Sequence, residues 1–205
     1  MDTSTLIPAF VTLFVVIDPV GLAPIFVALT HGRTPSARRT IAVRACGISV
    51  GLLLLFLFLG EAVLAFLGIS MPAFRIAGGL LLFLTALEML FERRSKRRED
   101  QASEEDGPDP SVFPLAIPLI AGPGAIASII LLAGETKGEV AAILALIAVM
   151  LATVGCVLAL FLASGVIERL LGKTGITVVT RLLGMLLAAL SVQFVLDGLR
   201  GFGLA

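Results

Sequence analysis

The sequence predicts an all-α, polytopic membrane protein. Its six transmembrane helices are expected to form two inverted three-helix repeats, with discontinuous first and fourth helices. Three observations support this fold class. Hydrophobic residues make up 58% of the 205-residue chain, and the mean hydropathy is +1.08, more apolar surface than a soluble domain of this size can bury. The apolar residues fall into runs that suit a bilayer. Several landmarks of the first half recur in the second.

Each apolar run is about 20 residues or longer, the length that a helix needs to cross the hydrocarbon core. The runs place helices near residues 4–29, 40–67, 71–91, 112–133, 139–167 and 176–199. This division gives a first repeat over 1–91, a charged linker over 92–111 and a second repeat over 112–205. Cys46 and Cys156 fall inside apolar runs, and we expect packed thiols there rather than a disulfide.

Basic residues gather in alternate loops, which predicts the orientation by the positive-inside rule. On one side lie Arg33, Arg38, Arg39, Arg93, Arg94, Lys96, Arg97, Arg98, Arg169 and Lys173. The other side keeps Arg75, Lys137 and Arg200. The 92–111 linker is therefore predicted to be cytoplasmic, against anionic lipid. Both termini are predicted to be periplasmic or extracellular, in a protein of the inner (plasma) membrane.

Four landmarks recur at a nearly constant spacing of about 105 residues, which is typical of an internal repeat. The matching positions are Asp18-Pro19 with Gly122-Pro123, Arg75-Ile76-Ala77-Gly78 with Arg181-Leu182-Leu183-Gly184, Thr85 with Ser191, and Glu61 with Glu168. Each repeat has three helices, an odd number, so the two halves must cross the membrane in opposite directions. This predicts a pseudo-twofold axis in the membrane plane.

The first predicted helix carries a carboxylate, two prolines and a glycine near its centre, at Asp18, Pro19, Gly21 and Pro24. Asp followed by Pro has the residue types of a helix N-cap and first helical position. The two prolines lack backbone donors, so carbonyl groups one turn earlier lose their helical partners. Lipid cannot satisfy such groups, and the break must therefore be buried in protein or line a cavity.

The fourth predicted helix has its own break at Gly122 and Pro123, with no side chain at the cap position. We expect the helix to restart there with the N–H groups of Gly124, Ala125 and Ile126 free. Free N–H groups at the positive end of a helix form a ready site for an anion.

Facing each other, the two breaks suit the two ends of a small zwitterion such as a neutral amino acid. The predicted substrate-binding residues are Asp18, Pro19, Val20, Gly21, Leu22, Gly122, Pro123, Gly124 and Ala125. Asp18 is also the candidate for carrying a coupling proton, because an ionisable group inside a membrane marks a functional site. Two alternatives stay open: Asp18 as a cap that touches no ligand, and the Gly122 break as a kink for close packing.

Other polar residues in the predicted helices have less defined roles. Glu61 and Arg75 lie toward the predicted outer ends of their helices, and Glu168 and Arg181 are their counterparts near the inner face. We interpret them as clamp pairs with snorkelling side chains or as gate pairs that open alternately. Candidates for lining a polar pathway, or for hydrogen bonds between helices, are Thr85, Ser191 and Gln193.

Two segments resemble the hallmark motifs of the MarC family of membrane proteins, also called the neutral amino acid transporter family. They read FVVIDPVGLAPIF at 14–26 and PLAIPLIAGPGAI at 114–126. The resemblance extends over nearly the whole chain. It implies six spans and uptake or exchange of small neutral amino acids such as glycine and alanine, coupled to protons. This chain has Leu22 where many relatives have Asn.

The sequence therefore predicts a secondary transporter with a midplane site, and not an enzyme. No nucleotide-binding Gly-rich loop occurs, so the energy source is a gradient. An intramembrane protease would need catalytic partners at one depth, and the single His31 lies in a loop. A metal site would need several ligands at the midplane, and only Asp18 qualifies. No cofactor, metal or nucleic-acid partner is predicted. The remaining alternative is a channel or exporter for other small solutes.

Overall fold

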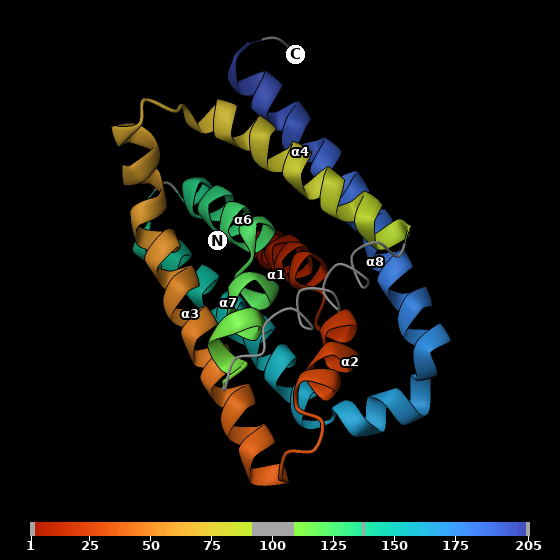
Figure 1. Cartoon of the computed structure of the whole chain (residues 1–205). Helices are drawn as coiled ribbons and strands as arrows, with labels where there is room; N and C mark the ends of the chain where they lie inside the picture. Colours follow the sequence, from red (N-terminus) through yellow and green to blue (C-terminus); the bar gives the residue numbers. More distant parts are fainter. Residues whose placement is uncertain (1–2, 92–108, 137, 204–205) are drawn as a thin grey trace.

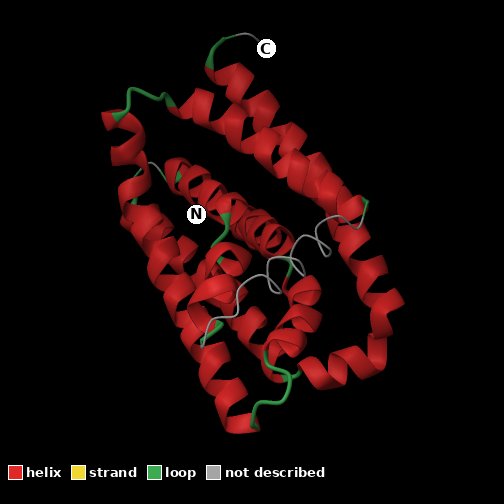
Figure 2. Ribbon diagram, viewed as in Figure 1, coloured by secondary structure: helices red, strands yellow, loops and turns green. Residues whose placement is uncertain are grey.

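The computed structural model is an all-helical bundle, and it describes residues 3–91, 109–136 and 138–203 (Figures 1 and 2). No strand is present in these ranges. The first four helices are α1 (Thr3–Ile17), α2 (Pro19–Leu29), α3 (Pro35–Phe66) and α4 (Met71–Leu90). The remaining elements are the π-helical stretch η1 (Ser111–Ile120), α6 (Pro123–Glu135), α7 (Val140–Leu162) and α8 (Ser164–Gly201). Most of the predicted linker, 92–108, lies outside the described residues.

The helices confirm a polytopic membrane architecture with five to six candidate spans. Five of them lie at Leu6–Leu29, Pro35–Phe66, Met71–Leu90, Val140–Leu162 and Thr174–Gly201. The sixth is a bent pair, Ser111–Ile120 with Pro123–Glu135, whose axes differ by 55°. At about 1.5 Å of rise per residue, α3 is longer than a bilayer core requires, in line with the long second run of the sequence.

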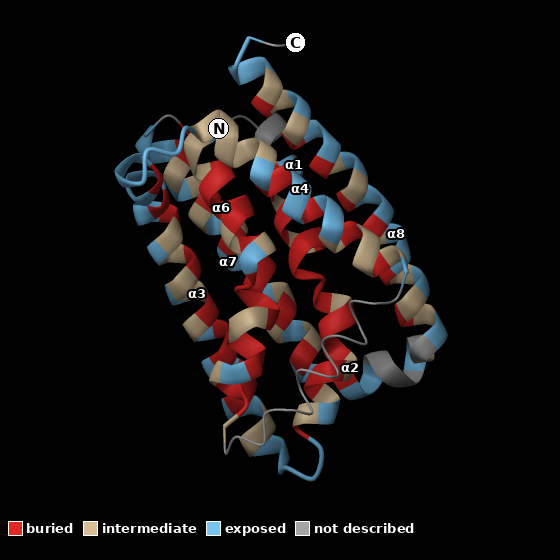
Figure 3. Ribbon diagram, turned by 45° about the horizontal axis from the view of Figure 1, so that its top comes forward, coloured by how far each residue is buried: buried red, intermediate tan, exposed pale blue. Residues whose placement is uncertain are grey.

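The span that contains Asp18 lies at the centre of the bundle. In its most apolar window 67% of the residues are buried, against 28% to 33% for the other four straight spans. Large apolar side chains of α3 and α7 are exposed instead, among them Phe58, Phe66 and Leu144. In Figure 3 the buried residues accordingly gather on α1, α2, η1 and α6. An outer layer with exposed apolar side chains is the pattern that contact with lipid requires.

Several of the contacts between helices recur when the two halves of the chain are exchanged. The helices α3 and α7 contact each other, and α3 packs on η1 and α6 as α7 packs on α1 and α2. Likewise, α4 packs on α6 as α8 packs on α2. The two halves are therefore interleaved, and each completes the core of the other.

The helices α4 and α8 lie side by side and antiparallel (Figure 1). Their facing residues, taken along α4, are Ile76 with Gly198, Gly79 with Ser191, and Met89 with Gly184. A Cβ added at Gly79 would lie 2.8 Å from the carbonyl oxygen of Ser191. Small residues that allow such close approach are the usual packing device of helices in lipid.

The fifth span ends earlier than the sequence predicted, at Leu162 rather than near residue 167. The chain continues as a short helix over 164–171 and then turns sharply at Gly172, with φ 61° and ψ 178°. Only glycine adopts that backbone conformation readily. The turn sets the short helix across the end of the bundle before the long part of α8 begins (Figure 1).

Candidate functional site

The first break is a change of backbone conformation at one residue, Asp18. The helix α1 ends at Ile17, Asp18 adopts a left-handed conformation with φ 58° and ψ 64°, and α2 begins at Pro19. The predicted cap and first helical position are thereby confirmed. Leu6–Leu29 still passes as one span, so the discontinuity predicted for the first helix is local. A left-handed backbone at a residue other than glycine costs about 1–3 kcal/mol, and such strain clusters at functional sites.

The Asp18 side chain is 1% exposed and folds over the first turn of α2. Its Oδ1 accepts a hydrogen bond from the Gly21 N–H at 3.1 Å, and the Leu22 N–H donates to the Asp18 carbonyl at 3.1 Å. A Cβ at Gly21 would overlap the Asp18 carboxylate. Glycine at position 21 is therefore what allows the carboxylate to cap α2. Val20, in the same turn, is half-buried.

The second break is larger than the first and includes the segment before it. The sequence predicted a helix over 112–133, but η1 contains two residues with extended backbone, Phe113 and Ile117. Each precedes a proline, Pro114 or Pro118, and both of these peptide bonds are cis. A residue before proline is disfavoured in the helical region. Two prolines four residues apart were the signal that the sequence reasoning left unused.

The helix α6 begins at Pro123 with Gly122 as its N-cap, as predicted, and Gly122 offers no side chain to the first turn. The Ile126 N–H donates to the Gly122 carbonyl at 2.9 Å, so the prediction that Ile126 would be free was wrong. The N–H groups of Gly124 and Ala125 precede this first bond of the helix. Intrahelical partners are absent for such groups, and they carry the positive end of the helix dipole.

The two breaks lie against each other in the centre of the bundle. A Cβ added at Gly124 would lie 3.1 Å from Cγ1 of Val16 and 3.4 Å from Cδ2 of Leu82. The first turn of α6 thus packs on the last turn of α1, two residues before Asp18, with α4 on its other side. Ala125 is buried and Gly124 half-buried, whereas Pro123 is exposed. The structure therefore brings together one buried carboxylate and one helix N-terminus that has no capping side chain.

Ser128 is a candidate site residue that the sequence reasoning missed. It is fully buried, and its Oγ has no hydrogen-bond partner among the described residues. By contrast, Ser49 and Thr153, equally buried, donate to the carbonyl groups of Ala45 and Val149 one turn earlier. A buried hydroxyl without a partner costs about 1–3 kcal/mol. Ser128 lies one turn beyond Gly124, and a small polar residue at that place was the signal available in the sequence.

The helical period places Ser128 on the α1 side of α6. Gly124 touches both α1 and α4, while Leu131 contacts the α4 residue Gly78. Going around the axis of α6 at about 100° per residue, Ser128 and Leu131 lie on opposite sides of Gly124. The unpartnered hydroxyl therefore belongs to the same face of α6 as the contact with the first break.

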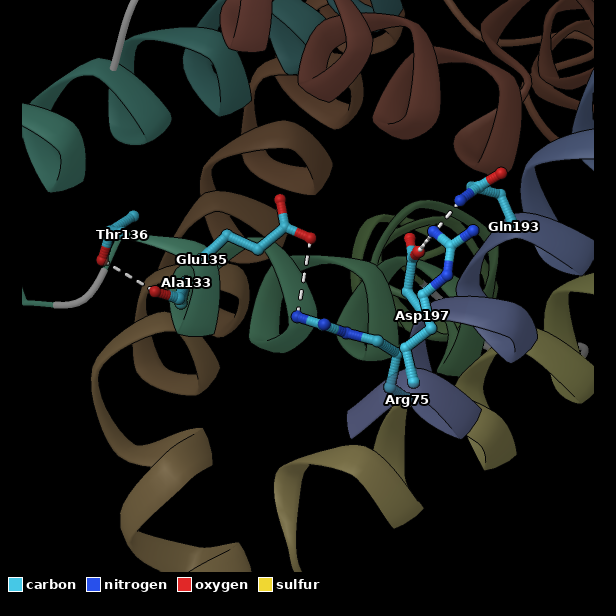
Figure 4. A network of polar contacts seen from close by, with 7 residues as sticks. Arg75, Ala133, Glu135, Thr136, Gln193 and Asp197 are labelled. Atoms are coloured by element: carbon cyan, nitrogen blue, oxygen red, sulfur yellow. Dashed lines mark hydrogen bonds and ion pairs between the residues drawn. The ribbon is translucent and has the colours of Figure 1, made fainter. Parts of the chain in front are cut away.

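The charged residues form an ion pair that the sequence did not predict. Arg75 pairs with Glu135, with 3.6 Å between Nη2 and Oε1, rather than with Glu61 (Figure 4). Glu61 lies nearby, since its Oε1 would be 3.0 Å from a Cβ at Gly134. The pair joins the start of α4 to the end of α6. A clamp or gate role for Glu61 and Arg75 stays a prediction.

Asp197 in α8 accepts hydrogen bonds from Gln193 at 2.9 Å and from Arg200 at 3.3 Å (Figure 4). Thr85 and Ser191 donate to carbonyl groups of their own helices, Leu81 at 3.0 Å and Ala188 at 2.7 Å. These bonds satisfy both hydroxyls locally. A pathway-lining role for Thr85, Ser191 and Gln193 stays a prediction.

The remaining sequence-based candidates are less informative. Arg181 is exposed, and the Glu168 side chain lies outside the described part of the structure, so their role as a clamp or gate pair stays a prediction. Cys46 and Cys156 are free thiols, as expected. Among the described residues, no group of three or more His, Cys, Asp and Glu side chains is placed to hold a metal ion.

These features define a polytopic membrane protein with two interrupted helices meeting at its core. The chain belongs to the MarC family of integral membrane proteins, whose family model matches residues 3–202. This confirms the resemblance seen in the sequence. No solved structure matches the chain.

Three relatives illustrate the extent of the similarity. A UPF0056 membrane protein of Methanocaldococcus jannaschii is 35% identical, over 98% of both chains. The UPF0056 inner membrane protein YhgN of Escherichia coli K12 is 37% identical, over 95% of this chain and 96% of the relative. The Bacillus subtilis UPF0056 membrane protein YvbG is 36% identical, over 98% and 97%. The family and the multi-pass membrane architecture are thus shown.

Proposed function

We propose that this protein is a secondary transporter that moves a small neutral amino acid, of the glycine or alanine kind, across the inner membrane. The single observation that carries the proposal is the packing of Gly124 on Val16. This contact brings the buried Asp18 carboxylate and the uncapped start of α6 to the same place in the bundle. A zwitterion needs a negative partner for its ammonium group and a positive partner for its carboxylate, and the two breaks supply one of each.

Discontinuous helices near the midplane are the usual way in which transporters build a substrate site. The half-helix N-terminus of α6 is the proposed partner of the substrate carboxylate, with Ser128 as an additional donor. Asp18 is the proposed partner of the substrate ammonium and the proposed carrier of a coupling proton. The exchange of contacts between the two halves supports transport by rocking of two inverted repeats around this site.

The orientation follows from charge and is part of the proposal. The described basic residues Arg33, Arg38 and Arg39 lie where α2 ends and α3 begins, and we place that end in the cytoplasm. The 92–111 linker then lies in the cytoplasm and both termini outside. The name of the Escherichia coli relative describes an inner membrane protein, which supports the proposed location.

A channel or exporter for other small solutes is the alternative function. The close packing of the centre favours a carrier, because Asp18 and Leu22 are 1% and 0% exposed. An open pore requires a hydrated path past such residues. The tightly packed core is instead consistent with a site that opens to one side at a time.

Thermal unfolding of the purified protein in detergent, with each of the twenty amino acids in turn, tests the proposed substrate class. A ligand that binds only the folded state raises the unfolding temperature in proportion to its occupancy. We expect stabilisation by small neutral amino acids and by no acidic or basic one. Stabilisation by none of the twenty would contradict the proposal.

A further inference from the structure

Two aromatic rings from different halves of the chain are stacked near one end of the bundle. The rings of Phe26 in α2 and Phe161 in α7 are 4.4 Å apart between centroids and nearly parallel, at 7°. Both side chains are 1% exposed. Each ring lies in the last turns of its helix, so the stack closes the space between the ends of α2 and α7.

Arg38 covers this stack from the start of α3. Its guanidinium carbon lies 5.6 Å from the centroid of the Phe26 ring, within the range of a cation–π contact. The same guanidinium donates a hydrogen bond from Nη2 to Oγ of Ser164 at 3.1 Å, and Ser164 is 1% exposed. Arg38 therefore connects the start of α3 to the first residue of α8.

The stack lies between the candidate site and the end of the bundle. Phe26 is eight residues beyond Asp18 along α2, which corresponds to about 12 Å at the helical rise. The helices that contribute the four side chains are α2, α3, α7 and α8, and α2 is in contact with both α7 and α8. Phe26 therefore lies on the stretch of α2 that leads from Asp18 to this end of the bundle.

The three contacts among these four side chains can break and form again. A ring stack, a cation–π contact and one hydrogen bond each depend on the relative position of two elements. None of them is covalent or part of a helix. When the halves rock against each other, the ring stack and the hydrogen bond from Arg38 to Ser164 break, because each joins one half of the chain to the other. Arg38 and Phe26 belong to the same half and move together.

We propose that Phe26, Phe161, Arg38 and Ser164 form the cytoplasmic gate of the transporter. The proposal rests on the transport function proposed above and adds the residues that close one side of its site. In the state described here this gate is shut. Opening separates the rings, releases Arg38 from Ser164 and exposes the Asp18 break to the cytoplasm.

The test measures water access to the break and needs no substrate. A single cysteine is introduced by Val20→Cys into a chain whose native thiols are removed by Cys46→Ser and Cys156→Ser. A membrane-impermeant maleimide is applied to intact cells and, separately, to inside-out vesicles. Labelling of residue 20 then reports which side of the membrane reaches the site.

Replacing both rings, by Phe26→Ala with Phe161→Ala, is expected to raise the labelling rate in inside-out vesicles about tenfold, since the stack is the main closure. Labelling in intact cells stays at the parent level. Arg38→Ala raises the rate by a smaller factor, and Arg38→Lys stays near the parent. Size-exclusion profiles verify folding. If the double alanine variant fails to fold, two other variants provide the readout. One is the double change Phe26→Leu with Phe161→Leu, and the other is the single change Arg38→Ala.

Two control variants match the changes in chemistry. Phe10→Ala with Phe14→Ala removes the tilted aromatic pair of α1, whose centroids are 5.7 Å apart. Arg39→Ala removes the neighbouring, exposed arginine. Neither control is expected to change labelling from either side.

An unchanged labelling rate in the folded gate variants, or an increase from the outside, would overturn the gate. That result is distinct from failure of the transport proposal. If no amino acid binds but labelling of residue 20 in inside-out vesicles rises, the gate is supported and the proposed substrate class is contradicted. If amino acids bind and the labelling does not change, the proposed function is supported and the gate is contradicted.

Discussion

Gly124 lies against Val16, so that a Cβ on the glycine would be 3.1 Å from Cγ1 of the valine. The two residues belong to separate interrupted spans, more than 100 positions apart. Their contact places the start of α6 beside the end of α1 and brings an uncapped helix N-terminus close to a buried carboxylate. The proposed site depends on this contact.

The Asp18 cap leads to a prediction for Gly21. The change Gly21→Ala places a methyl group where the Asp18 carboxylate lies, so either the carboxylate or the first turn of α2 must move. We expect a loss of about 1–3 kcal/mol of stability and of amino acid binding. Thermal unfolding with and without ligand measures both. Gly51→Ala is the control, because a Cβ there meets no described atom within 4 Å. Equal effects of the two changes would contradict the cap.

The change Ser128→Ala distinguishes a structural role of this serine from a role in substrate binding. The change Ser128→Ala removes a buried hydroxyl that has no partner in the described structure, so the ligand-free protein should keep or gain stability. If Ser128 binds the substrate, affinity should fall about tenfold, the effect of losing one hydrogen bond. Ligand titrations of unfolding temperature measure this. Ser49→Ala, which removes a hydroxyl bonded within its own helix, should leave affinity unchanged.

The antiparallel contact of α4 and α8 predicts a packing defect at Gly184. A Cβ there would lie 2.9 Å from the Cβ of Met89 and 3.3 Å from the Ala86 carbonyl oxygen. Gly184→Leu should therefore lower stability by about 1–3 kcal/mol through overpacking. Gly155→Leu is the control, because a Cβ at this exposed position meets no described atom within 4 Å. Thermal unfolding in one detergent compares the two, and a similar melting temperature for both would contradict the described packing.

Asp109, outside the spans, predicts a pH effect. Ser111, whose backbone N–H donates to Oδ1 of Asp109 at 3.0 Å, together with the ion pair to Arg44 holds the pKa of Asp109 below its ordinary value of 3.8. A carboxyl whose pKa is lower in the folded state stabilises it while ionised. This contribution is complete above the ordinary value and disappears as the pH falls through the folded pKa. Because the pair is exposed, the effect is below about 1 kcal/mol.

The corresponding variant is Asp109→Asn. It should unfold at a lower temperature than the parent at neutral pH, and the difference should shrink as the pH falls below 3.8. High salt should also reduce the difference, since exposed ion pairs are screened. A difference that is independent of pH would show that the ionised carboxylate does not contribute.

Both breaks could be predicted because their causes are local. Asp18 before Pro19, and Gly122 before Pro123, carry the cap and the first helical residue in two adjacent positions, whatever the rest of the chain does. The lengths of the spans followed from the hydrophobic runs for the same reason. The irregular backbone before Pro114 and Pro118 also has a local cause. It was not predicted because the apolar run over 112–133 was interpreted as a helix.

The contacts between distant elements could not be predicted. Arg75 pairs with Glu135, and Phe26 stacks on Phe161, because of how the two halves interleave. Spacing along the chain does not encode such pairs. The unpartnered hydroxyl of Ser128 became visible only once its neighbours were known, since Ser49 and Thr153, equally buried, bond to their own helices.

The most direct test of the central claim is counterflow in proteoliposomes with the Asp18→Asn variant. The parent protein should exchange labelled for unlabelled neutral amino acid, and a pore would not. Asp18→Asn should lower the exchange rate at least about tenfold, because the substrate ammonium loses a charged partner. Asp197→Asn, which changes a carboxylate bonded to Gln193 and Arg200, should exchange at nearly the parent rate. Parent-level exchange by Asp18→Asn of every amino acid tested would contradict the account.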